Sequence, residues 1–234
     1  MKLNELDYSE QNIQYHSELN PAAWSGWSMH PEVRERLLDI AQLFVDYLEL
    51  PDFDVDDVRL TGSMCNFNWT KYSDFDLHIV TDYSALDSNN IAEALYNAKK
   101  TIWNDRHDIT IHGYDVELYI EDSAKPPHSA GMFSVYDNQW IVKPEMVDPK
   151  YDHAAVNNKV KAGIDLLQKT IRSADSVDDF DRAIAKIYRM RQSGLEAGGE
   201  FSTENLAFKV LRNMGWIERL RDARANFIDK TYSI

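Results

Sequence analysis

The spacing of hydrophobic residues divides the chain into a front part that mixes helices with strands and a back part that is helical throughout. In the front part, apolar residues recur at helical spacing from Pro31 to about Leu50 and from Asp87 to Trp103, which predicts two amphipathic helices. Pro31 suits the first turn of a helix, and Pro51 ends that helix. The residues predicted to face the core are Val33, Leu37, Ile40, Ala41, Phe44 and Leu48 in the first helix and Ile91, Leu95, Ala98 and Ile102 in the second.

Short runs that alternate apolar and polar residues predict strands around the second of these helices. The predicted strands are Val58–Thr61, Asp74–Thr81, Ile109–Ile111, Tyr114–Ile120 and a hairpin of Met132–Val135 with Gln139–Val142. Residues 1–30 show neither period, which predicts an irregular arm that packs Trp24 and Trp27 against the body of the protein.

The back part begins after a linker marked by Pro144 and Pro149. Helical spacing then predicts three helices, at Asp152–Ser173, Val177–Leu195 and Thr203–Ile228, with Gly198-Gly199 between the last two. The chain is therefore expected to be an α+β protein of two domains, residues 1–149 and residues 150–234, the second a helical bundle.

Composition narrows the class of protein. The chain has 234 residues, of which 44% are hydrophobic and 12% aromatic, enough to bury a substantial core. One cysteine, Cys65, excludes an intrachain disulfide framework and a cysteine zinc site. The apolar runs are far shorter than a membrane span, and the N-terminus lacks the apolar centre of a signal peptide, so we expect a cytoplasmic protein.

Charge is unevenly distributed along the chain. The formal net charge is −14, which disfavours a broad surface for nucleic-acid backbones. Residues 151–234 contain 14 Lys and Arg against 12 Asp and Glu, a net of +2, which leaves −16 for residues 1–150. The acidic half could bind cations, and the other half could meet anionic phosphates.

The strand predicted at Asp74–Thr81 has an unusual polar face. Successive side chains of a strand point to opposite faces, so Asp74, Asp76 and His78 share one face. The other face carries the apolar residues Phe75, Leu77 and Ile79. Aspartate is depleted in strands, and like charges on one face repel each other. The pair Asp74 and Asp76 therefore predicts a bound cation, and His78 is expected to be a hydrogen-bond partner near the site rather than a ligand.

Two further features extend this prediction. Gly62-Ser63 follows a short strand, and backbone amides after such a glycine can hold phosphate oxygens. The predicted strand at Tyr114–Ile120 repeats the acidic pattern with Asp115 and Glu117 on one face. Magnesium prefers oxygen ligands shared between carboxylates and substrate phosphates, and two such ions can stabilise the attacking and leaving oxygens of an in-line displacement. Three carboxylates from two strands beside a phosphate-binding turn thus indicate two-metal phosphoryl or nucleotidyl transfer.

These motifs, taken together, resemble the DNA polymerase beta-like nucleotidyltransferase superfamily. The motifs are Leu60-Thr61-Gly62-Ser63, then Ser73-Asp74-Phe75-Asp76-Leu77, then Val116-Glu117-Leu118. They cover about 60 residues; the residue before Gly62 is Thr, a mild departure from the pattern. The stretches VELYIED, GMFSVYDNQWIVKP and GGEFSTENLAFKVLRNMGW are also similar to uncharacterised nucleotidyltransferase-like proteins of phage and bacterial genomes.

The resemblance implies a mixed sheet with flanking helices and the transfer of NMP from an NTP such as ATP to an acceptor hydroxyl, with release of pyrophosphate. Asp74, Asp76 and Glu117 would be the catalytic acids and would hold two Mg²⁺ or Mn²⁺ ions, with Asp115 the alternative third acid. Residues expected to bind the nucleotide are Gly62, Ser63, Ser73 and Lys209, the last in the otherwise apolar NLAFKVL run of the helical half.

The acceptor is left open by these residues: a small molecule, a protein hydroxyl, an RNA end or a second nucleotide, with long nucleic acid disfavoured by the acidic charge. Two other functions use the same features. One is a nucleotide sensor or protein-binding module that keeps the fold without catalysis. The other is a metal-dependent phosphohydrolase that uses the same acids.

Overall fold

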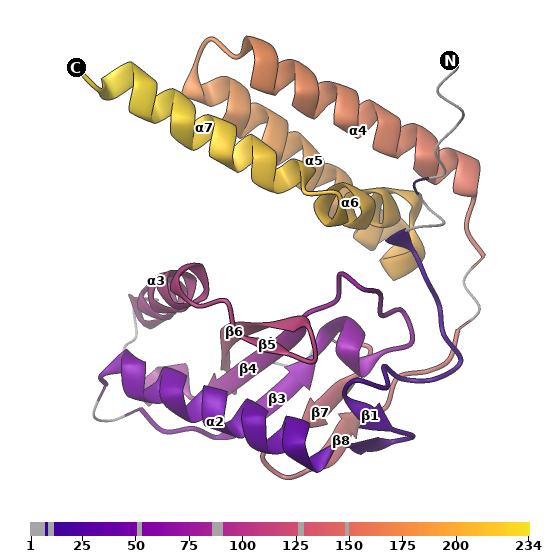
Figure 1. Ribbon diagram of the computed structural model, residues 1–234, viewed down its shortest axis with the longest axis vertical. Coiled ribbons are helices and arrows are strands. Elements are labelled where there is room, and N and C mark those ends of the chain that lie inside the picture. Colours follow the sequence, from indigo (N-terminus) through magenta and orange to yellow (C-terminus); the bar gives the residue numbers. More distant parts are fainter. Residues whose placement is uncertain (1–7, 9–11, 51–52, 86–90, 126–128, 148–149) are drawn as a thin grey trace. The chain divides into compact units, whose positions relative to one another are not determined.

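The chain forms two compact units in a computed structural model that describes residues 8, 12–50, 53–85, 91–125, 129–147 and 150–234 (Figure 1). The sheet unit comprises Tyr15–Val147, and the helical unit comprises the described residues of Met1–Gln14 and Asp148–Ile234. The predicted α+β class, with a mixed sheet followed by C-terminal helices, is confirmed. The domain boundaries 1–149 and 150–234 stay a prediction.

The sheet unit is built on a six-stranded sheet with the order β5-β6-β4-β3-β7-β8. Its central strands β4 and β6 are parallel, and the other neighbouring strands are antiparallel, so the sheet is mixed. The strands are β3 (Asp57–Thr61), β4 (Phe75–Thr81), β5 (Thr110–Ile111), β6 (Tyr114–Asp122), β7 (Met132–Ser134) and β8 (Gln139–Val142). All the strands predicted from alternation are present.

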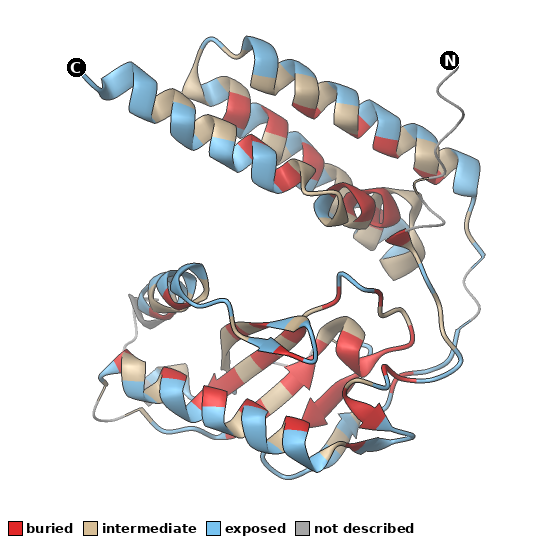
Figure 2. Cartoon of the chain, in the orientation of Figure 1, coloured by how far each residue is buried: buried red, intermediate tan, exposed pale blue. Residues whose placement is uncertain are grey.

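Helix α2 (Pro31–Leu48) covers the apolar face of this sheet (Figure 1). It begins with Pro31 in its first turn and ends at Glu49, which has a left-handed backbone with φ 53°. All six residues predicted to face the core are buried: Val33, Leu37, Ile40, Ala41, Phe44 and Leu48. They join one core with Phe75, Leu77 and Ile79 of β4 (Figure 2), which leaves the opposite, polar face of β4 for chemistry.

Helix α3 (Ile91–Arg106) buries a different face from the predicted one. Leu95 and Ile102 are 40% and 42% exposed, whereas Tyr96 and Trp103 are 1% and 7% exposed. The two large aromatic rings bury more area than the aliphatic residues, and the side-chain amide of Asn104 exchanges two hydrogen bonds, of 3.0 and 3.1 Å, with the backbone of Leu118. These contacts set the rotation of α3. The predicted start at Asp87 lies outside the described residues.

The N-terminal arm is more ordered than predicted. Trp24–Ser25 (β1) and Ser28–Met29 (β2) pair as antiparallel strands around Gly26, which has a positive φ of 59°. Trp24 is buried, and its ring stacks on that of Trp140 with centroids 4.6 Å apart. Trp27 is 46% exposed and contacts Phe67 and Trp140 edge to face. The prediction of an irregular segment was therefore wrong for these residues. Each of the two strands is only two residues long, which is too short to show an alternating pattern in the sequence.

Residues 150–234, all of which the structure describes, form four α-helices rather than the three predicted. These are α4 (His153–Ser173), α5 (Val177–Gly198), α6 (Thr203–Asn213) and α7 (Trp216–Tyr232). The predicted helix Thr203–Ile228 is interrupted at Gly215, whose φ of 72° lies in the left-handed region that glycine adopts at helix ends. Asp152 and Ser202 cap α4 and α6 by accepting hydrogen bonds from backbone amides. No described helix combines the length and the hydrophobicity that a transmembrane span requires.

Candidate metal and nucleotide site

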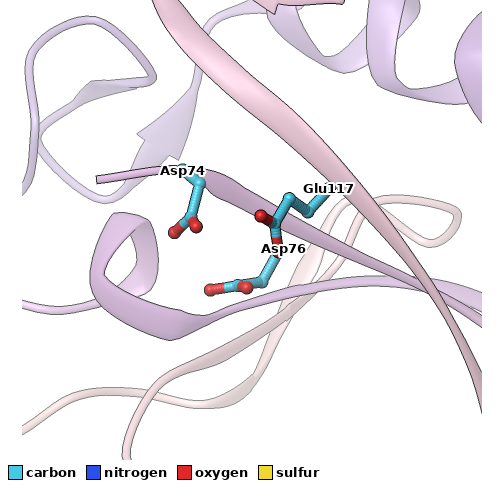
Figure 3. Close-up of side chains that lie close together, drawn as sticks. All are labelled: Asp74, Asp76 and Glu117. Carbon is cyan, nitrogen blue, oxygen red and sulfur yellow. The ribbon is translucent and has the colours of Figure 1, made fainter. Parts of the chain in front are cut away.

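Three carboxylates meet on the polar face of the sheet. Asp74 directly precedes β4, Asp76 is its second residue, and Glu117 lies opposite Asp76 on the parallel strand β6. One carboxylate oxygen from each residue lies within 4.8 Å of the other two (Figure 3). The neighbouring residues Phe75 and Val116 point into the core, and this alternation turns the acids outward. The structure thus brings together the three acids that the sequence analysis predicted to form the site.

Gly62 closes the site on the β3 side. It follows Thr61, which pairs with Asp76 in the antiparallel register of β3 and β4. Gly62 has a φ of 73°, and a Cβ atom there would collide with Oδ2 of the Asp76 carboxylate. Glycine is therefore required both for the backbone conformation and for the close approach of this carboxylate. The short 3₁₀ helix η1 (Gly62–Cys65) begins at this point.

Ser63 and Ser73 are joined by a hydrogen bond next to the acids. The Ser63 hydroxyl donates to Oγ of Ser73 over 2.7 Å, and the backbone amide of Thr70 donates to the same atom over 2.9 Å. Ser73 is buried and so fixes the loop that leads into Asp74. The two serines connect the turn after β3 to the start of β4.

Tyr119 holds one of the acids in place. Its hydroxyl donates a hydrogen bond of 2.5 Å to Oε2 of Glu117. Burial of the ring, followed by the bond to Glu117, raises the pKa of Tyr119, so this hydroxyl stays protonated and can donate. Sequence reasoning gave Tyr119 no role, although its position two residues after Glu117 on the same strand face could have indicated this bond.

His78 is a hydrogen-bond partner beside the acids, as its position on the acidic face predicts. Its Nδ1 lies 3.0 Å from Oε2 of Glu121, and its Nε2 lies 3.1 Å from Oγ1 of Thr61. Its ring stacks on that of Tyr119 with centroids 4.9 Å apart. Glu121 also contacts Arg59 at 3.5 Å. These contacts connect β3, β4 and β6 on the sheet face that carries the three acids.

A cavity of about 530 Å³ opens from the same face. Gly62 and Asp76 are among the residues that line it. Its lining comes from β3, β4, α3, β6 and β7 and from the segments after β4 and β6, and includes His78, Tyr83, Glu93, Tyr119, Glu121, Asp122 and Lys125. The lining residues extend from Thr61 to Met132 along the sequence, and no single motif marks them.

The other candidate residues belong to other elements. Asp115 is exposed and pairs with Thr110 of β5, and it is outside the acidic group that the described residues form. Lys209 lies on α6, where its Nζ is 2.9 Å from Oε1 of Glu200. Cys65 is buried, and burial, reinforced by Asp76, raises the pKa of its thiol, which is consistent with a structural role.

The acids fit a magnesium or manganese site by their chemistry. Magnesium binds carboxylate oxygens at about 2.1 Å, so two oxygens on opposite sides of one ion lie about 4.2 Å apart. The spacing of less than 4.8 Å among Asp74, Asp76 and Glu117 is compatible with ligands of one ion or of two ions that share carboxylates. All three residues offer oxygen only, which favours magnesium or manganese over zinc.

Comparison with known proteins gives little further information. No protein-family model matches the chain, and no curated protein matches it. One solved structure is similar, that of a STING-associated CdnE c-di-GMP synthase from Capnocytophaga granulosa, with 12% sequence identity over 87% of this chain and 84% of that chain. The TM-score is 0.24, which is too low to support a conclusion about function.

Proposed function

We propose that the protein is a metal-dependent nucleotidyltransferase that moves NMP from an NTP to an acceptor hydroxyl and releases pyrophosphate. The observation that carries this proposal is the meeting of Asp74, Asp76 and Glu117 within 4.8 Å, directly beside a glycine turn that touches the Asp76 carboxylate. Carboxylates alone would fit many cation sites. The adjacent turn adds a place for phosphate, and the combination fits the handling of a nucleoside triphosphate.

The acids, the glycine turn and Tyr119 would have different roles in the transfer. Asp74, Asp76 and Glu117 hold Mg²⁺ or Mn²⁺, which would neutralise charge on the phosphates and favour ionisation of the acceptor hydroxyl. Gly62 and Ser63 bind the terminal phosphates, and Ser73 keeps Ser63 and the loop before Asp74 in place. Tyr119 orients Glu117 through its hydrogen bond.

Lys209 of the helical unit is proposed to supply a cation to the triphosphate. In the structure it is partly buried and paired with Glu200. Its ammonium group would exchange this carboxylate for a phosphate when the nucleotide binds.

The direct test uses labelled nucleotide. The protein is incubated with each α-labelled NTP, Mg²⁺ or Mn²⁺ and cell extract, next to an Asp74→Asn/Asp76→Asn double variant. We expect metal-dependent pyrophosphate release and a labelled product, reduced by roughly 1,000-fold or more in the variant. An Asp54→Asn/Asp108→Asn double variant removes the same charge from exposed positions of the sheet unit and serves as the matched control.

Other outcomes would assign other functions. Release of nucleoside monophosphate or inorganic phosphate without labelling of any acceptor would indicate a phosphohydrolase. Binding of NTP without turnover would indicate a sensor. The absence of pyrophosphate and label above the double variant, for all four NTPs, would rule out the proposed transfer.

A further inference from the structure

Residues 15–24, here called the arm segment, contact both stretches of chain that carry the proposed site. The arm segment leads into β1 and belongs to the sheet unit (Figure 1). One of the two stretches is η1, which begins with Gly62 and Ser63. The other is residues 66–73, here called the acid loop, which leads from η1 into Asp74. The arm segment can therefore fix these two stretches relative to each other.

His16 of the arm segment contacts the acid loop through both its backbone and its ring. Its backbone amide donates a hydrogen bond of 2.8 Å to the backbone oxygen of Phe67. Its ring Nε2 lies 3.0 Å from the backbone oxygen of Trp69, and a carbonyl oxygen only accepts, so Nε2 carries the proton and donates. The ring also stacks on that of Trp69, with centroids 3.5 Å apart and an angle of 7° between the planes. One residue thus binds two positions of the loop.

The acid loop also donates a bond back to the arm segment. Nε1 of Trp69 donates to the backbone oxygen of Glu18 over 3.0 Å. Residues 66–73 form neither helix nor strand, so contacts to other segments must offset the conformational entropy that the loop loses when it is ordered. The bonds to His16 and Glu18 supply part of this stabilisation.

The part of the loop that His16 contacts continues directly into the metal and phosphate site. The amide of Thr70 donates to Oγ of Ser73 over 2.9 Å, and the amide of Ser73 donates to the backbone oxygen of Thr70 over 3.0 Å. The Ser63 hydroxyl donates to the same Oγ over 2.7 Å. Because Asp74 is the next residue, a shift of Trp69 would be passed through Ser73 to both Ser63 and Asp74.

The arm segment also binds η1, through Met64. Nε1 of Trp24 donates to the backbone oxygen of Met64 over 2.7 Å, and Nδ2 of Asn20 donates to its sulfur over 3.3 Å. All three residues are buried, so water does not compete for these bonds. Met64 directly follows Ser63. The phosphate turn and the acid loop are therefore attached to the same short stretch of chain.

Asp74 depends on the acid loop more than the other two acids do. Asp76 and Glu117 lie within paired strands and are opposite each other in the parallel register of β4 and β6. Asp74 precedes β4, and the pairing of this strand begins only at Phe75. The position of the Asp74 carboxylate is therefore set by the loop that ends at Ser73.

We propose that His16 is a positioning residue of the metal site, and that the hydrogen bond from its ring to Trp69 keeps Asp74 where metal binding requires it. This inference rests on the proposed metal-dependent transfer. His16 acts through the acid loop, and Asp74 remains the ligand. A displacement on the order of 1 Å can lower a rate by about 100-fold, so a loosened loop would impair the site in a protein that still folds.

Three single variants test the ring bond by Mn²⁺ affinity, measured by electron paramagnetic resonance. His16→Phe keeps a ring that can stack on Trp69 and loses the donor, whereas His16→Gln keeps an N–H donor of similar reach. His30→Phe is the matched control, because Nε2 of His30 lies 3.0 Å from the backbone oxygen of Pro21 and this bond does not involve the acid loop. We expect the dissociation constant for Mn²⁺ to rise by about tenfold in His16→Phe and to change little in the other two.

Several results would overturn the inference. An unchanged Mn²⁺ affinity in His16→Phe would show that Asp74 needs no support from the arm segment. An equal rise in His30→Phe would assign the effect to a general loosening of the N-terminal residues. An equal rise in His16→Gln would contradict the role of the ring donor.

Hydrogen exchange without metal locates the effect in the chain. We expect the amides of Thr70 and Ser73 to exchange about tenfold faster in His16→Phe, because the loop opens locally, and to keep their rate in His30→Phe. Faster exchange throughout the sheet unit to the same degree would indicate a loss of overall stability and would contradict a positioning role.

An activity measurement separates this inference from the proposed function. With NTP and saturating Mn²⁺, kcat for pyrophosphate release should fall by roughly tenfold or more in His16→Phe and recover in His16→Gln. Full activity and Mn²⁺ affinity in His16→Phe would refute the positioning role and leave nucleotidyl transfer intact. An Mn²⁺ affinity that depends on His16, without pyrophosphate release from any NTP, would refute the transfer and leave the positioning role intact.

Discussion

Gly62 is the residue on which the geometry of the acids depends most closely. Its missing side chain makes room for the Asp76 carboxylate, and its φ of 73° is one that other residues adopt only with strain. Gly62→Ala should therefore displace Asp76 as well as strain the turn. We expect metal-dependent activity to fall by roughly 100-fold or more, while circular dichroism still shows a folded protein.

Gly113 provides the matched control for this change. It also has a positive φ, of 83°, but a Cβ atom there would meet nothing within 4 Å. Gly113→Ala carries the same backbone strain, of about 1 kcal/mol, without the collision. Equal losses of activity in both variants would show that strain in the sheet, rather than displacement of Asp76, is responsible.

Tyr119 should affect metal binding through Glu117. Tyr119→Phe removes the hydroxyl that donates to Oε2 of Glu117 and leaves the ring. Loss of such an orienting partner commonly weakens metal binding by about 10- to 100-fold. We expect a rise of that order in the dissociation constant for Mn²⁺, measured by electron paramagnetic resonance.

Tyr83→Phe is the control for this measurement. The Tyr83 hydroxyl donates to the backbone oxygen of Ile120 and not to one of the three acids. Its removal should leave Mn²⁺ affinity unchanged. Unchanged affinity in Tyr119→Phe as well would mean that Glu117 needs no orienting bond.

At the scale of elements, the packing of α5 against the start of α6 depends on Gly194. A Cβ atom there would lie 2.5 Å from Cβ of Glu204 and 2.7 Å from Oγ of Ser202, the residue that caps α6. Gly194→Ala should destabilise the helical unit by roughly 1 to 3 kcal/mol, although alanine favours a helix by about 1 kcal/mol. Urea unfolding would measure the change.

Ser193→Ala is the neighbouring control, at an exposed position of the same helix. It gains helix propensity without a collision and should be neutral or slightly stabilising. A stabilising effect of Gly194→Ala would show that α6 can move away from α5 at little cost.

The sequence predicted correctly the elements whose buried face follows from a regular apolar pattern within the element itself. The continuous aliphatic stripe of α2 and the alternation of β4 and β6 specify which faces are buried, and this placed Asp74, Asp76 and Glu117 on one side of the sheet. The prediction of which face of α3 is buried was wrong, because the rotation of this helix depends on partners outside it, among them the backbone of Leu118.

Hydrophobic periodicity also missed the break between α6 and α7 and the cavity. The interruption between α6 and α7 rests on the left-handed conformation of Gly215, and apolar spacing continues through it. The cavity has no motif because its lining comes from several separate segments, and its shape follows from how α3 and the strands pack. Only the three-dimensional arrangement shows that Asp76 lines the same cavity as Glu93, Glu121 and Asp122.

At the scale of the whole molecule, the charge is divided between a strongly acidic first part, at −16 for residues 1–150, and a second part with a net of +2. If Lys209 supplies a cation to the triphosphate, Lys209→Gln should raise KM for the NTP by about tenfold with little change in kcat. Steady-state kinetics with varied NTP would measure both.

Lys169→Gln is the control for Lys209, since it removes an exposed lysine of the same unit. It should leave KM unchanged. A Lys209→Gln variant that loses stability but keeps its KM would assign Lys209 to the ion pair with Glu200 alone.

The central claim is that Asp74, Asp76 and Glu117 hold divalent metal against a nucleoside triphosphate. The most direct measurement is a crystal structure with Mn²⁺ and an α,β-methylene NTP, which cannot be cleaved at the reacting bond. We predict anomalous manganese peaks within bonding distance of all three acids, with the terminal phosphates at Gly62 and Ser63. A nucleotide bound elsewhere, or the absence of manganese at the three acids, would contradict the proposed function.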